Sequence, residues 1–149
     1  MNMRLSFYCF VLTSFFIAGC ATPKRVAFTA TQCPPDKALV YVYWAGSGTS
    51  EDRLAIDVKG EHKALIHAYG YYPLLLAPGS VELGYSAQVN PIYPIRIGKT
   101  DALSITLNAG ETYYVAYKPW DGWKPKLVLM DNEKGEKEIS ACTIGKVWQ

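Results

Sequence analysis

The amino-acid sequence predicts an all-β protein, a single antiparallel β-sandwich or partly open barrel. Short β-type runs recur about every 8–12 residues and are separated by Gly, Pro, Asn or Asp. Tyrosine is abundant, with 11 tyrosines among 149 residues, and β-branched residues are common. Such a composition suits half-buried pleated surfaces. Amphipathic helical stretches are few and no βαβ alternation is visible, so a parallel α/β fold is not expected.

The predicted strands follow one another from Lys37 onward. They are 38–44, 54–58, 63–66, 72–76, 81–85, 103–107, 112–117 and 126–130. Pro78-Gly79 is the clearest turn, because Pro presets φ and Gly accepts positive φ. Asp131–Gly135 is predicted to be a polar loop before Glu138-Ile139. A short helix is expected, if anywhere, near Asp101 or the C-terminus.

The first 19 residues have the pattern of a secretory signal. Met1–Arg4 is a short basic start, Leu5–Ile17 is an apolar run, and small residues lead to Cys20. The apolar run is shorter than the roughly 20 residues that a membrane-spanning helix requires. A basic start, a short apolar core and a small-residue exit together predict export.

The end of this leader, Ile17-Ala18-Gly19-Cys20, resembles the bacterial lipobox. The resemblance implies cleavage before Cys20, a diacylglyceryl group on its thiol and an acyl chain such as palmitate on the new amine. Each buried CH₂ adds about 0.8 kcal/mol, so several chains anchor firmly. Ala21, where an Asp would favour retention, implies the outer membrane, facing the periplasm. An ordinary signal peptidase site or an uncleaved anchor are the alternatives.

Three regions are therefore predicted. Residues 1–19 are the signal peptide, residues 20–36 are the lipidated N-terminus and a tether, and residues 37–149 are the sandwich domain. The tether shows no sustained hydrophobic period.

Two cysteines remain after Cys9 leaves with the leader and Cys20 is lipidated. Cys33 and Cys142 form an even pair in an exported chain, which predicts a disulfide. Closing a loop of about 100 residues would stabilise the fold by roughly 4.7 kcal/mol in the chain-entropy model. The alternative is two free thiols. No metal site is expected, because no paired C-x-x-C exists and the two histidines are five residues apart.

Three segments together resemble a family of small bacterial lipoprotein domains of unknown function. They are Ala38–Tyr43, Leu74–Leu83 and Leu107–Val115, in that order. The resemblance covers about Lys37 to Met130 and implies a β-rich fold in a lipoprotein, with no catalytic residues. Trp44 stands where the family often has Arg, so no role of that Arg carries over.

The sequence offers little chemistry. The formal charge of +2, which falls by one when the leader is removed, gives no case for nucleic-acid binding. Ala45–Gly48 lacks the spacing of a nucleophile elbow and of a phosphate loop. We therefore expect no enzyme and no cofactor.

One loop is a candidate binding site. Trp120 and Trp123 lie in a Pro/Gly-rich segment flanked by Lys118 and Lys124. Exposed aromatic residues on loops often bind ligands, here a sugar ring or lipid headgroups. The alternative is a hairpin whose tryptophans fold back on the sandwich edge. The aromatic group Tyr69–Tyr72 is expected to be cross-strand packing.

Three functional hypotheses follow. The first is a non-catalytic envelope module, held at the membrane by its lipid, that presents an edge or loop to a protein partner. The alternative is a glycan-binding module that uses Trp120 and Trp123 on peptidoglycan. An envelope hydrolase is the least favoured, because no nucleophile–base constellation is recognisable.

Overall fold

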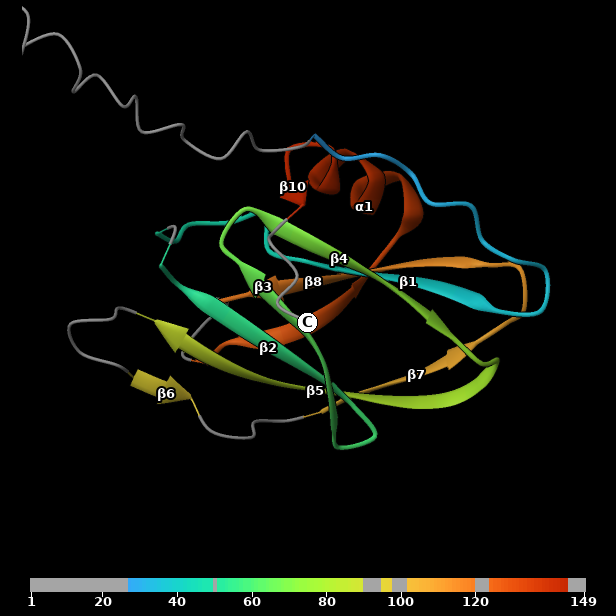
Figure 1. Ribbon diagram of the computed structural model, residues 1–149, viewed down its shortest axis with the longest axis horizontal. Helices are drawn as coiled ribbons and strands as arrows, with labels where there is room; N and C mark the ends of the chain where they lie inside the picture. Colours follow the sequence, from blue (N-terminus) through green and yellow to red (C-terminus); the bar gives the residue numbers. More distant parts are fainter. Residues whose placement is uncertain (1–26, 50, 90–94, 98–101, 120–123, 145–149) are drawn as a thin grey trace, which may run out of the picture.

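Two β-sheets packed face to face form the domain (Figure 1). The computed structural model describes residues 27–49, 51–89, 95–97, 102–119 and 124–144. The predicted fold class, a β-sandwich, is confirmed. In the described residues, no helix is long and apolar enough to cross a membrane.

Each sheet has five strands. The first sheet has the order β10-β4-β1-β8-β9, and the second has the order β3-β2-β5-β6, with β7 also paired to β5. The strands of the first sheet are β1 (Ala38–Tyr43), β4 (Gly70–Leu76), β8 (Thr112–Lys118), β9 (Lys126–Met130) and β10 (Thr143–Ile144). Those of the second are β2 (Arg53–Val58), β3 (Glu61–His67), β5 (Gly79–Val89), β6 (Ile95–Ile97) and β7 (Leu103–Leu107).

The pairing is mostly antiparallel, as expected, but two pairs are parallel. β1 lies parallel to β8, with Tyr41 opposite Tyr114, and β10 lies parallel to β4. The long connection between β1 and β8 lets the chain return to the end where β1 began, which a parallel pair requires.

The central strand β1 is buried on both of its faces. Ala38, Val40 and Val42 face the second sheet within the core between the sheets, whereas Leu39, Tyr41 and Tyr43 pack in a second apolar cluster. This explains the continuous apolar run in the sequence, because a strand covered on both faces loses the apolar–polar alternation. β2, which is covered on one face, keeps its alternation.

A helix near the C-terminus covers part of the outer face of the first sheet. A short helix was expected near Asp101 or the C-terminus, without bounds. α1 (Asn132–Ile139) occupies the stretch expected to be a polar loop before Glu138-Ile139, so the prediction of a loop there was wrong. The carboxylate of Asp131 caps the helix by accepting a 2.9 Å hydrogen bond from the Lys134 amide. Gly135 permits close approach to the sheet, since a Cβ there would lie 2.4 Å from Tyr114.

Residues 27–36, which we call the strap, cover a further part of this face (blue in Figure 1). Ala27 forms an isolated β-bridge with Thr143, and the Phe28 ring packs edge-on against Tyr41 and Tyr71. The Thr31 amide donates a 2.6 Å hydrogen bond to the Tyr41 hydroxyl. Much of the predicted tether is therefore part of the packed domain.

The two ends of the sandwich differ, because the strap begins at one of them. The tethered end is where Ala27, Thr143 and the β3–β4 turn at Tyr69 meet. The far end carries the β4–β5 turn at Pro78 and the turn at Gly110. β4 has seven residues and runs from one end to the other, a distance of about 20 Å.

Candidate functional site

A polar cluster lies at the tethered end, where three elements converge on Glu138. This carboxylate projects from the last turn of α1. It accepts a 3.0 Å hydrogen bond from the hydroxyl of Tyr43, at the end of β1, and lies 2.9 Å from Nζ of Lys118, at the end of β8. The parallel pairing of β1 and β8 brings these two strand ends together.

Burial and the neighbouring Glu138 raise the pKa of Tyr43. Burial also acts to raise the pKa of Glu138, but hydrogen bonds from Lys118 and Tyr43 outweigh it and hold that pKa below its ordinary value. Near neutral pH the phenol is thus a fixed donor and the carboxylate a fixed anion. A general acid or base works best with a pKa near the operating pH, so this cluster is suited to holding α1 on the sheet and not to proton transfer.

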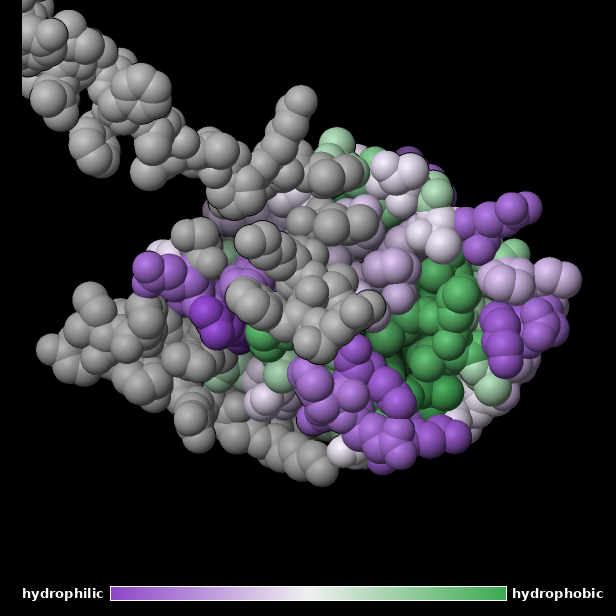
Figure 2. All heavy atoms as spheres, in the orientation of Figure 1, coloured by the Kyte–Doolittle hydropathy of each residue, from purple (hydrophilic) through white to green (hydrophobic). Residues whose placement is uncertain are grey.

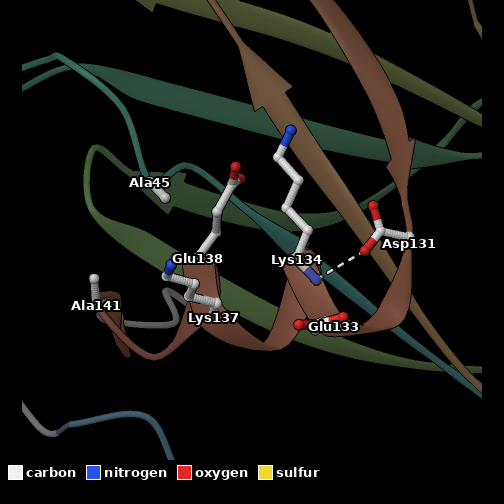
Figure 3. A pocket seen from close by; sticks show the side chains of 7 residues that line it. All are labelled: Ala45, Asp131, Glu133, Lys134, Lys137, Glu138 and Ala141. Atoms are coloured by element: carbon white, nitrogen blue, oxygen red, sulfur yellow. Dashed lines mark hydrogen bonds between the residues drawn. The ribbon is translucent and has the colours of Figure 1, made fainter.

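A shallow pocket adjoins the cluster (Figure 3). It is lined by Ala45, Asp131, Glu133, Lys134, Lys137, Glu138 and Ala141. Glu138 and Lys134 extend in the same direction from α1, and Ala45 lies opposite Glu138. The lining offers charged side chains but no Ser, Cys or His, so it contains no Ser–His or Cys–His pair.

Two of the four residues of the predicted binding loop, Lys118 and Lys124, are among the described residues. Lys118 is half-buried and is ion-paired with Glu138, so it supports the fold, whereas Lys124 is exposed. Trp120 and Trp123 lie outside the described residues, as does Cys20. Because β8 ends at Lys118 and β9 begins at Lys126, the loop leaves and returns at the tethered end.

The predicted disulfide between Cys33 and Cys142 is not formed, and both thiols are free. The Cys33 thiol donates to the carbonyl of Lys37, 3.4 Å away, beside the start of β1. Cys142 lies beyond the other end of β1, next to Thr143, and donates to the carbonyl of Glu138. A six-residue strand spans about 20 Å, far beyond the roughly 7 Å between Cα atoms that a disulfide permits.

The tyrosines near residue 70 differ in their packing. Tyr71 packs against Phe28 and Tyr41, which confirms the expected packing for that residue. Tyr69 does not pack in this way: it occupies the β3–β4 turn with a positive φ of 61° and is 41% exposed. His62 is exposed and His67 is half-buried. Within the described ranges, no group of three His, Cys, Asp or Glu side chains is placed to hold a metal ion.

The Tyr43–Glu138–Lys118 cluster was missed by the sequence analysis. Its three members are far apart in the chain and join only through the β1–β8 pairing and the placement of α1. One local signal was available. Asp131 is a preferred N-cap residue and Glu133 follows it in the first turn, a pattern that favours the start of a helix.

Comparison with known proteins gives no relative: no protein-family model, no curated protein and no solved structure matches the chain.

Proposed function

We propose that this protein is a lipoprotein of the bacterial envelope. Its leader is removed, Cys20 carries the lipid, and the sandwich is held at a membrane surface as a non-catalytic module that binds another envelope protein. The observation that carries this proposal is the sequence Ile17-Ala18-Gly19-Cys20 directly after a basic and apolar leader. The outer membrane, with the domain facing the periplasm, is the proposed location.

The strap supports this proposal. Only residues 21–26 separate Cys20 from Ala27, the first described residue, which is bridged to Thr143. The seven residue-to-residue steps from Cys20 to Ala27 reach about 24 Å when the chain is fully extended. A lipid on Cys20 would therefore keep the sandwich close to the bilayer.

An apolar surface at the other half of β4 supports a role in protein binding. Figure 2 shows hydrophobic residues gathered right of centre, where β4 runs toward its end in Figure 1. Leu75 is 49% exposed there, and half-buried Leu76 follows it. Exposed apolar patches with a polar rim mark interaction sites on many soluble domains. This surface lies toward the far end of the sandwich.

Fractionation of cells tests the lipid anchor. We expect the wild-type chain in the membrane fraction and Cys20→Ser outside it or unprocessed, because the serine hydroxyl cannot replace the thiol in lipidation. Cys9→Ser is the matched control, because it changes the other cysteine of the N-terminal region. Equal membrane association of Cys20→Ser and wild type, with the leader removed from both, would contradict the proposal.

The alternative function is glycan binding by the loop between Lys118 and Lys124. Its support is the pair of tryptophans in the sequence and the exposure of Lys124 at the tethered end. Tryptophan rings stack well on sugar faces, and peptidoglycan would be the ligand.

A further inference from the structure

Three chain segments meet at one corner of the tethered end. The carbonyl of Tyr69 accepts a 2.8 Å hydrogen bond from the amide of Thr143, and Thr143 in turn forms the β-bridge to Ala27. The chain that would carry the lipid thus enters the fold beside the β3–β4 turn. Phe28, packed on Tyr41 and Tyr71, fixes this point of entry.

The length of the connection restricts how the domain can lie. A flexible chain of seven residues has a typical end-to-end distance of about 15 Å. β4 separates the two ends of the sandwich by about 20 Å. If Cys20 is lipidated, the tethered end is therefore held nearer to the bilayer than the far end.

Tyr69 is placed to contact that bilayer. It is 41% exposed at the tip of a turn and adopts a positive φ, which is costly for residues other than Gly. The turn therefore holds an aromatic ring outward at a backbone position where Gly would be less strained. Tyrosine is enriched at membrane–water interfaces because its ring is apolar and its hydroxyl is polar.

The charges of the two ends differ in sign. At the tethered end the exposed cations are Arg53, Lys124 and Lys126, against exposed Glu51, and the ion pair of Lys118 with Glu138 adds no net charge. Lys24-Arg25 lies in the connection itself. The far end carries more carboxylates than lysines: Asp36, Asp57, Glu61, Glu82 and Glu111 against Lys37, Lys59 and Lys63. Anionic phospholipids attract Lys and Arg within about one Debye length.

We propose that the tethered end docks directly on the anionic phospholipid leaflet that holds the lipid anchor, with Tyr69 at the headgroups. This inference rests on the proposed lipidation of Cys20. The far end, including the exposed Leu75 surface, then projects away from the membrane toward a protein partner.

Photocrosslinking tests the orientation. The lipidated full chain is reconstituted in vesicles of phosphatidylethanolamine and phosphatidylglycerol, with p-benzoylphenylalanine replacing either Tyr69 or Ser80. Ser80 is exposed near the β4–β5 turn and reports the far end. We expect on the order of tenfold more phospholipid adduct, measured by mass spectrometry, from position 69 than from position 80.

The outcomes separate this inference from the proposed function. Equal adduct yields from a chain that floats with the vesicles would overturn the docking and leave the lipid anchor standing. A chain that does not float at all would overturn both.

Two double variants test the attraction between the lysines of the tethered end and the anionic phospholipids. Lys124→Glu combined with Lys126→Glu should lower the adduct at position 69 several-fold at low salt. The matched control, Lys59→Glu with Lys63→Glu at the far end, should leave it unchanged. An unchanged yield in the first pair, with the fold intact by circular dichroism, would overturn the docking.

Discussion

The hydroxyl of Tyr43 lies 3.0 Å from Oε2 of Glu138, and this hydrogen bond joins the end of β1 to the last turn of α1. The same carboxylate pairs with Lys118, so one side chain of the helix is held by two strands of the first sheet. The helix and the strap together cover part of the outer face of that sheet. Contacts that hold α1 should therefore matter for the stability of the domain.

Tyr43→Phe should lower the free energy of unfolding by about 1–2 kcal/mol, because it removes a hydrogen bond to a charged acceptor and keeps the ring. Urea denaturation measures the change. Tyr113→Phe is the matched control, since its hydroxyl bonds to Glu111 in an exposed setting and its loss should cost less. Equal losses for the two variants would contradict the structural role of Tyr43.

The stabilisation from Glu138 should depend on pH. Its pKa in the folded protein is below the ordinary value, so the contribution is present above the unfolded carboxyl's pKa of about 4.3 and is lost as the pH falls through the lower folded value. The difference in stability between wild type and Glu138→Gln should thus be constant from pH 7 to about pH 5 and shrink below about pH 4. Urea midpoints over this range give the measurement. A difference that grows in acid would reverse the sign assigned here.

Gly135→Ala should destabilise the protein by about 1–3 kcal/mol, as overpacked sites do. A Cβ at this position would meet Cβ and Cγ of Tyr114 at 2.4 Å, so α1 must move away from β8. Gly84→Ala is the control, because its Cβ would meet the Asp57 side chain at an ordinary 3.7 Å. Thermal unfolding of both variants compares them. A neutral Gly135→Ala would show that the helix does not need this close approach.

The two remaining thiols should differ in reactivity. Cys142 is buried, and burial raises its pKa to about 11, whereas Cys33 is half-buried. The thiolate is the reactive form, so at pH 8 an alkylating reagent should modify Cys33 first and Cys142 only on unfolding. Peptide mass spectrometry under non-reducing conditions identifies the products. A Cys33–Cys142 cross-linked peptide would contradict the geometry of β1.

Replacing Trp120 and Trp123 together by Ala separates the two candidate functions. If the protein is a partner-binding module, the double variant should sediment with peptidoglycan no differently from wild type. Loss of peptidoglycan binding, with the fold preserved by circular dichroism, would favour the glycan-binding alternative. Lys63→Ala, a change at the far end, is a control for nonspecific effects of surface substitution.

The strands were largely predictable from the sequence because each carries a local signal. β2 alternates apolar and polar residues, and the Pro78-Gly79 turn before β5 uses residues with defined backbone preferences. β6 is short and was not anticipated. The parallel β1–β8 pair was not foreseen, since pairing of strands remote in the chain leaves no short-range pattern.

The outer layer was harder to predict. The strap was expected to be a tether, because Thr, Pro and Gln show no period and Phe28 alone cannot reveal a contact with Tyr41 and Tyr71. The disulfide was predicted from the number of cysteines alone. That number carries no information on distance, and the length of β1 separates the two thiols. Contacts between residues remote in the chain depend on the fold and leave no local pattern in the sequence. The cluster around Glu138 could not be predicted for the same reason.

The chemical state of residue 20 is the direct test of the account. Intact-mass spectrometry of the chain purified from bacterial envelopes should show a protein that begins at Cys20 and carries the added mass of three acyl chains and a glyceryl group. A mature chain with an unmodified N-terminus, recovered in soluble form from the periplasm, would contradict the proposal that a lipid confines this sandwich to the membrane surface.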